Sequence, residues 1–131
     1  LGAGNDVLMV GTTPYADAYD TGTATLGAGA DRVIVAPTSF DTINQVLTDF
    51  DPAQDQLGVL VPPEASGTLT MTSSYDAASQ TTILTFDTGP SGPGEIFTVR
   101  LQGVSTAITP GMIRLYADET TALTGSFYRT L

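Results

Sequence analysis

Apolar side chains in the second half of the chain alternate with polar ones at a period of two residues, not at helical spacing. The apolar runs are short, rich in β-branched and aromatic residues, and bounded by turn residues, which is typical of strands. We therefore expect strands at 56–61, 68–71, 82–86, 96–101 and 112–116.

The connections between these strands predict how they are arranged. Residues 75–79 read as a tight turn, and 87–95 form a longer loop rich in Gly and Pro. Three strands joined in this way make an antiparallel meander, and the fourth would close a small sheet or sandwich. The pattern favours an all-β fold, with no helix except one short helical turn at 42–47.

The first half of the chain repeats one pattern: Gly, any residue, Gly, any residue, Asp, any residue, aliphatic. Glycines permit a tight turn at positive φ with carbonyls pointing inward, and the aspartate adds an anionic oxygen. Two such turns, stacked, would surround a cavity lined by oxygen, which Ca²⁺ prefers, whereas transition metals favour nitrogen or sulfur. The two copies place Gly2, Ala3, Gly4 and Asp6 in the first turn, and Gly27, Ala28, Gly29 and Asp31 in the second.

These two segments resemble the hemolysin-type (RTX) calcium repeat, Gly-Gly-x-Gly-x-Asp-x-aliphatic-x, which builds a parallel β-roll with calcium between its turns. The stretch from Asp41-Thr42-Ile43 to Asp49-Phe50 and Asp55 is similar to the segment that ends the roll in such proteins. The resemblance covers about residues 1–60. It implies a short calcium-binding parallel β-roll at 1–61 that runs into a small antiparallel β-sandwich or sheet at 62–131, packed on the roll as one unit.

The sequence departs from the family pattern in several places. Leu1 and Leu26 stand where the family has its first Gly, and Gln54 stands where the terminating segment has Gly. The two repeats lie 25 residues apart, whereas two nonapeptides take about 18. Residues 12–20 would then be a decayed opposite-side repeat, and 20–25 an insertion. The number of calcium ions is left open.

The resemblance also implies a set of calcium ligands. Asp6 and Asp31 would bind through their side chains, and the Gly and Ala residues of the two turns through their carbonyls. The acids of the terminating segment would complete a site: Asp49 and Asp55 first, then Asp41 and Asp51. Whether Asp17 and Asp20 are ligands is open. The alternative is that each glycine motif is a plain turn before a strand and that the acids are solvated.

Composition narrows the classes of function. The chain has no Cys, His, Trp or Lys, which excludes a thiol nucleophile, a disulfide, a zinc or copper site and a Ser–His dyad. A net charge of −10 argues against nucleic acid or anionic lipid as a partner. Residues 1–55 hold eight aspartates and one arginine. The aspartate carboxylates should therefore repel one another unless a cation is bound among them. No apolar run reaches the roughly 18 residues of a membrane helix.

We therefore expect a non-catalytic, calcium-binding C-terminal module of a longer, secreted bacterial protein. By the resemblance, it would pass unfolded through a type I secretion channel and fold on meeting extracellular calcium. Residues 119–131 are compatible with a C-terminal secretion signal, although they lack the acidic-then-aliphatic ending common in relatives.

Rival functions belong to other classes. One is a calcium-independent structural or adhesion β-module of a larger surface protein. Another is a dimeric aspartic protease using Asp87-Thr88-Gly89, a tripeptide that also occurs at Asp20-Thr21-Gly22. The strand that braces such a site is missing, however, and Asp-Thr-Gly is also a natural turn tripeptide. A two-carboxylate glycosidase would lack Trp for sugar stacking.

Overall fold

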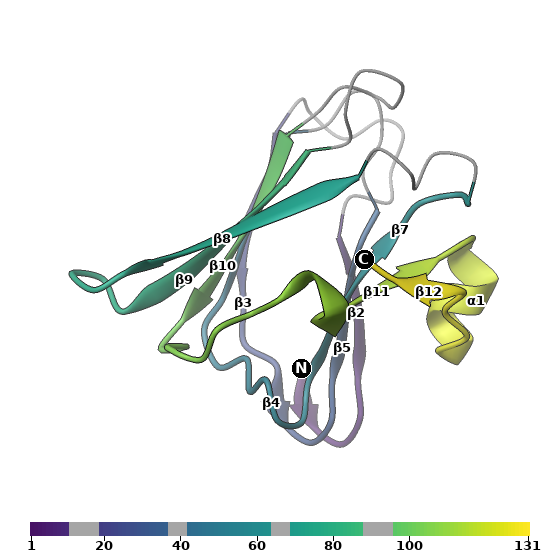
Figure 1. Cartoon of the computed structure of the whole chain (residues 1–131). Helices are drawn as coiled ribbons and strands as arrows, with labels where there is room; N and C mark the ends of the chain where they lie inside the picture. The colour runs from purple at the N-terminus through teal and green to yellow at the C-terminus, as the bar shows by residue number, and fades with distance from the viewer. Residues whose placement is uncertain (11–18, 37–41, 64–68, 88–95) are drawn as a thin grey trace.

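The computed structural model describes residues 1–10, 19–36, 42–63, 69–87 and 96–131. These segments are mostly β-strand with one short α-helix, which confirms the all-β expectation. Two five-stranded sheets face each other across an apolar core, and the turns near the N-terminus join them at one end (Figure 1).

The first sheet has the strand order β12-β11-β7-β5-β2. The strands β11, β7, β5 and β2 are parallel to one another, and only β12 is antiparallel to its neighbour. The strands are β2 (Val7–Val10), β5 (Arg32–Val35), β7 (Gln56–Leu60), β11 (Ile113–Tyr116) and β12 (Arg129–Thr130).

The second sheet has the order β3-β6-β10-β9-β8. Its first three strands are parallel, and β10, β9 and β8 form the antiparallel meander that the sequence predicts. The strands are β3 (Tyr19–Ala24), β6 (Thr42–Leu47), β8 (Thr70–Asp76), β9 (Thr81–Asp87) and β10 (Ile96–Gln102).

The chain passes back and forth between the sheets, from β2 to β3, then β5, β6 and β7. We call each passage through both sheets a coil. Parallel and antiparallel pairs are mixed within each sheet. β10 pairs in parallel with β6 and antiparallel with β9, and β11 pairs in parallel with β7 and antiparallel with β12. The fourth strand of the second half therefore crosses to the other sheet and does not extend the meander.

Two local expectations are wrong. Residues Thr42–Leu47 form β6 instead of a helical turn, because β3 and β10 pair with this segment from both sides. Residues 20–25 are not an insertion, since β3 pairs with β6 along six positions. The proposed decayed repeat at 12–20 lies largely outside the described residues.

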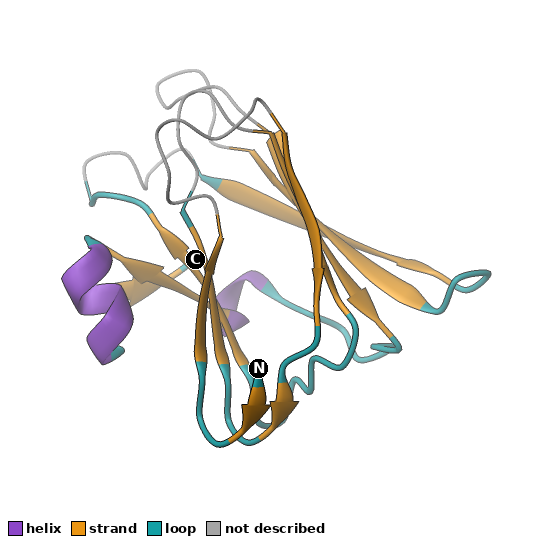
Figure 2. Ribbon diagram, turned by 180° about the vertical axis from the view of Figure 1, so that it is seen from behind, coloured by secondary structure: helices purple, strands orange, loops and turns teal. Residues whose placement is uncertain are grey.

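The α-helix, α1 (Glu119–Thr124), was not expected. Asp118 caps its N-terminus by accepting a hydrogen bond from the backbone of Thr121, and Gly125 ends it at a φ of 82°. A short 3-10 helix, η2 (Pro110–Met112), precedes β11. Figure 2 shows α1 outside the first sheet, at the opposite side from the second sheet.

Side chains from both sheets fill the core. The rings of Phe86 and Phe97 stack at 4.8 Å between centroids, and both residues are buried. They meet Leu57, Val59 and Leu115 of the first sheet in a single cluster. Since each half of the chain supplies strands to both sheets, the core belongs to the whole chain.

Candidate functional site

Three turns stack at the end of the sheets where the N-terminus lies (Figure 2). We call them the first turn (1–6), the second turn (26–31) and the third turn (50–55). Val7 is in register with Arg32, and Arg32 with Gln56, so the preceding aspartates Asp6, Asp31 and Asp55 occupy the same place in successive coils. Backbone bonds from Arg32 to Asp6 and from Gln56 to Asp31 hold this stacking, at 2.9 and 2.8 Å.

The aspartates are linked into a ladder. Oδ1 of Asp31 accepts a hydrogen bond from the backbone N–H of Asp6 at 2.8 Å, and Oδ1 of Asp55 accepts one from the N–H of Asp31 at 2.9 Å. The carboxylates of Asp31 and Asp55 thus each bond to the backbone of the coil before. We call this set of three residues the aspartate ladder.

The second carboxylate oxygens differ along the ladder. Asp31 is 1% exposed, and its Oδ2 has no hydrogen-bond partner among the described residues. Oδ2 of Asp6 is likewise buried and without a partner in that part of the chain. A buried polar oxygen without a donor is costly and is rare in folded proteins. In the third turn the cost is avoided, because Oδ2 of Asp55 accepts from the backbone N–H of Asp51 at 2.8 Å.

The glycines allow the first two turns to approach very closely. Gly27 and Gly29 have φ angles of 102° and 142°, and a Cβ on either would lie 1.9 Å from the carbonyl oxygen of Gly2 or Gly4. The short strands β1 (Gly2–Ala3) and β4 (Gly27–Ala28) pair here, and Gly4 donates to the carbonyl of Ala28 at 2.8 Å. The structure therefore brings together the turn residues that the repeat predicts as carbonyl ligands.

Asp49 lies beside the second turn and binds its backbone. Its two oxygens accept the N–H groups of Leu26 and Gly27 at 2.7 and 2.8 Å. Burial acts to raise the pKa of Asp49, but these backbone hydrogen bonds outweigh it and the pKa lies below its ordinary value. Asp49 thus positions the second turn from the coil that follows.

One member of the stack was missed by sequence reasoning. Oδ1 of Asn5 accepts from the backbone N–H of Ala30 at 2.9 Å, so its side chain links the first turn to the second. Its place directly before the repeat aspartate was the available signal. Asp51 acts within its own turn, where Oδ1 accepts from the N–H of Ala53 at 2.9 Å.

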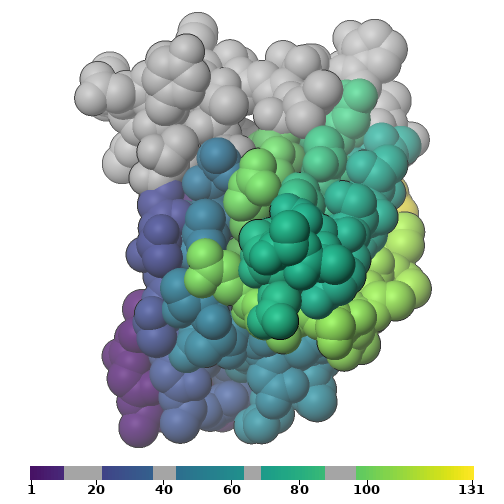
Figure 3. Space-filling model, turned by 90° about the vertical axis from the view of Figure 1, so that its left-hand side faces the viewer, coloured from purple at the N-terminus to yellow at the C-terminus, as the bar shows by residue number. Residues whose placement is uncertain are grey.

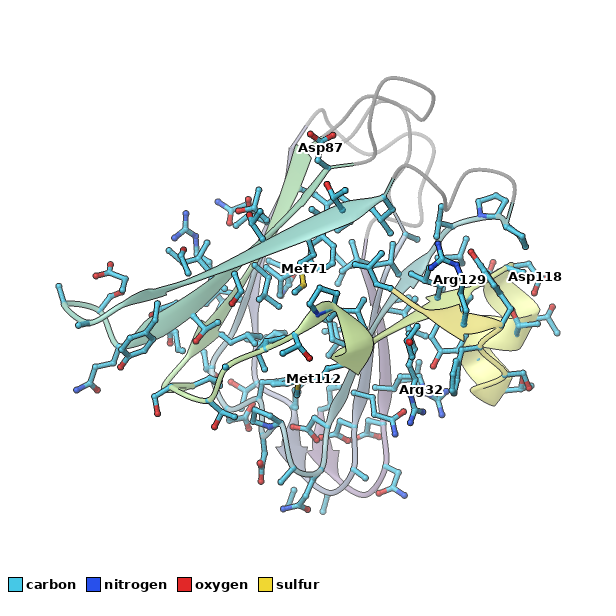
Figure 4. The ribbon with its side chains drawn as sticks, viewed as in Figure 1. Arg32, Met71, Asp87, Met112, Asp118 and Arg129 are labelled. Atoms are coloured by element: carbon cyan, nitrogen blue, oxygen red, sulfur yellow. The ribbon has the colours of Figure 1, made fainter. Side chains whose placement is uncertain are left out.

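The other acids considered as ligands lie elsewhere in the chain or outside its described part. Asp17 and Asp41 lie outside the described residues, and Asp20 lies on β3. Asp87 ends β9 and is exposed, at the opposite end of the sheets from the turn stack (Figure 4). Thr88 and Gly89 of the protease tripeptide are outside the described part of the chain.

The described turns offer a metal ion few carboxylate ligands. Within the described segments, no three His, Cys, Asp or Glu side chains come together as a metal-binding group. An ion beside Asp6 and Asp31 would therefore take most of its oxygens from backbone carbonyls and water.

A separate pocket of about 320 Å³ lies between the third turn and the C-terminal strands. Phe50, Leu57 and Phe127 are among its lining residues, together with Arg114. The guanidinium of Arg114 lies 4.6 Å above the centre of the Phe127 ring and donates to Oε1 of Gln56 at 2.6 Å.

Comparisons with protein-family models, with curated proteins and with solved structures find no match. No helix in the described segments is long and apolar enough to span a membrane.

Proposed function

We propose that this chain is a non-catalytic calcium-binding module in which Ca²⁺ binds beside Asp6 and Asp31, between the first and second turns. The observation that carries the proposal is the buried Oδ2 of Asp31, for which the described residues supply no donor, together with the same unpartnered oxygen on Asp6 one coil earlier. A hard cation held by these oxygens would offset the cost of burying them.

The charge of the chain supports a cation here. The net charge is −10, and the described turns bring Asp6, Asp31 and Asp55 into one ladder with no lysine in the chain to offset them. Ca²⁺ accepts six to eight oxygens in flexible geometry, so two carboxylates with turn carbonyls and water fit it. Mg²⁺ demands a stricter octahedron and gives up its waters reluctantly.

The third coil is a poorer ion site than the first two. Both oxygens of Asp55 accept backbone N–H groups, and so do both oxygens of Asp49. We assign these two residues to holding the turns in place. Asp6 and Asp31 keep the oxygens that would bind the ion.

The alternating passage of the chain between two sheets supports the narrower proposal of an RTX-type β-roll. In that proposal the module is part of a secreted bacterial protein, and it folds after type I export when calcium becomes available. At millimolar extracellular calcium, binding stabilises the folded state, whereas at low cytosolic calcium the aspartates of the first 55 residues oppose folding.

Thermal unfolding in EDTA and in about 5 mM calcium chloride tests the proposal directly, since extracellular calcium modules bind with dissociation constants of about 10⁻⁴–10⁻³ M. We expect a gain of about 1–2 kcal/mol per ion in calcium and no comparable gain with magnesium. The double variant Asp6→Asn, Asp31→Asn should lose the gain. Asp76→Asn, in the exposed β8–β9 hairpin, should keep it.

An equal midpoint in EDTA and calcium would overturn the proposal. The aspartate ladder would then serve only to bond backbone amides, and the calcium-independent structural or adhesion module would be the better description.

A further inference from the structure

The pocket between the third turn and the C-terminal strands has an apolar floor that both sheets supply. Leu101 of β10 lines it, together with Leu57 of β7 and Ile113 of β11, and all three are buried. In Figure 3 the lime-green atoms of η2 lie just above the blue-green atoms of the third turn, and both segments line the pocket. Its volume of about 320 Å³ is within the range of sites for small molecules.

Two large apolar side chains that line this pocket are left exposed. Met112 is 39% exposed and Phe127 is 40% exposed. Figure 4 shows Met112 extending from η2 toward the stacked turns. A methionine adapts its shape to a neighbour, and an aromatic ring offers a flat apolar wall. Exposed apolar side chains gathered around a hollow indicate a binding surface, and these two suit a flat apolar ligand.

The cation that lines this pocket, Arg114, is held in place without an acid. Its Nη1 donates to Oε1 of Gln56 at 2.6 Å, and its guanidinium carbon lies 4.6 Å from the centre of the Phe127 ring. Within the described segments Arg114 forms no ion pair, although the chain has 14 acidic residues. The amide oxygen and the ring therefore fix the orientation of the guanidinium while its charge stays unpaired.

These contacts leave one edge of the guanidinium free. Nε and Nη2 of Arg114 have no partner among the described residues, and neither is among the buried unpartnered atoms, so both are accessible. The two N–H groups on this edge of the planar group are parallel. Two parallel donors match the two oxygens of a carboxylate, which is the strongest kind of hydrogen-bonded partner for arginine.

The acid that lines the same pocket does not occupy this edge. Among the described lining residues Asp55 is the single acid, and its two oxygens accept the backbone N–H groups of Asp31 and Asp51. Arg114 is therefore available to an anion from outside the chain. The net charge of the chain is −10, but charges farther away than about 8 Å are largely screened at physiological salt, so the local contact decides binding.

We infer that this pocket binds a small free organic acid. The carboxylate of the acid pairs with the Nε–Nη2 edge of Arg114, and its flat apolar body lies against Phe127 and Met112. A neutral ligand of the same shape would leave the arginine donors to water, and an inorganic anion would leave the apolar rim exposed. The inference is independent of calcium binding beside Asp6 and Asp31, since neither aspartate lines the pocket.

Titration with 2-naphthoate, a flat aromatic carboxylate, tests the inference. The chain has no Trp, so the fluorescence anisotropy of the naphthoate can be followed with little emission from the protein. We expect saturable binding with a dissociation constant below about 1 mM. The uncharged 2-naphthamide should bind about tenfold or more weakly, because it cannot accept two charge-assisted hydrogen bonds. Changes in the backbone amide signals of Arg114 and Phe127 should locate the ligand.

Variants separate the charge from the shape of the pocket. Arg114→Met keeps an apolar stem but removes the donors, so it should weaken naphthoate about tenfold or more and abolish its advantage over naphthamide. Arg114→Lys, which keeps the charge but not the parallel donors, should fall between. Arg100→Met, on the second sheet, is the control and should bind as the parent does. If Arg114→Met does not fold, Met112→Ala at the exposed rim replaces it and should weaken both ligands by a similar factor.

Three results would overturn the inference: equal affinities for naphthoate and naphthamide, an unchanged affinity in Arg114→Met, or no saturable binding up to about 10 mM. The peptide acetyl-Gly-Gly-Phe presents the same chemistry at a chain terminus. If it binds more tightly than naphthoate, the ligand is a peptide end and not a free acid. Every titration is made in EDTA and in calcium. Naphthoate binding without calcium stabilisation would defeat only the proposed function, and the converse would defeat only this inference.

Discussion

At single positions, the distance between neighbouring coils decides which side chains the turns tolerate. Gly27→Ala and Gly2→Ala introduce the same methyl group at a positive φ, which strains the backbone by about 1–3 kcal/mol in each case. At Gly27 the methyl also meets the carbonyl of Gly2, since its Cβ would lie 1.9 Å from that oxygen. We expect Gly27→Ala to cost about 2 kcal/mol more than Gly2→Ala, as measured by denaturant unfolding. Equal costs would show that the turns do not stack this closely.

The pH dependence of stability tests Asp49. Its pKa is lowered in the folded state by the N–H groups of Leu26 and Gly27, so its contribution is fully present above the unfolded pKa, about 3.9, and is lost as the pH falls through the folded value. Asp49→Asn keeps one acceptor but loses the charge. We expect the variant to be less stable than the parent at pH 7, with a difference that shrinks below about pH 4. A difference that stays constant down to pH 2 would contradict this role.

Among the elements, α1 is held by a contact from outside itself. Six residues are too few for an autonomous helix. Nη1 of Arg32, on β5, donates to the carbonyls of Ala122 and Leu123 at 3.0 and 3.2 Å, where the helix ends. Arg32 lies beside α1 in Figure 4. A cation at a helix C-terminus is favourable because it complements the partial negative charge of the last carbonyls.

Arg32→Met should therefore release α1 while leaving the sheets in place. We expect a loss of about 1–2 kcal/mol and faster amide exchange at Ala122 and Gly125 than in β11. Arg100→Met is the matched control, since Arg100 makes one long hydrogen bond of 3.4 Å within the described segments, to Asn44 on the second sheet. If α1 stays as protected in Arg32→Met as in the control, the helix is held by packing alone.

The elements also show how far the sequence could predict the fold. Strands of alternating polarity, such as β9 and β10, were identified because burial on one face leaves a local pattern. The segment Thr42–Leu47 was misread because pairing with β3 and β10, distant in sequence, determines its conformation.

The candidate site was predictable to a similar degree. The Gly-x-Gly-x-Asp spacing led to Asp6 and Asp31, whose ladder hydrogen bonds and buried oxygens the structure adds. Asp55 was assigned to a terminating segment, and the structure shows it in register with them as the third rung. Its distance of 24 residues from Asp31 was a usable signal, but the Asp-Pro turn before it lacks the glycines that identify the repeat.

The whole molecule should behave as one cooperative unit, because its two halves share both sheets. Residues 1–61 contain β6 and β7, whose outer partners β10 and β11 come from the second half. Removing that half also removes Phe86, Phe97 and Leu115 from the core. Domains of about 60 residues bury a smaller share of their surface than larger ones and are marginally stable even when complete. We expect the full chain to show one unfolding transition, both by calorimetry and by core amide exchange.

A fragment of residues 1–61 should remain unfolded in calcium, as measured by circular dichroism. Mixing this fragment with residues 62–131 should restore sheet structure. A calcium-dependent cooperative transition in the fragment alone would instead make the stacked turns an autonomous domain, with the second half attached to it.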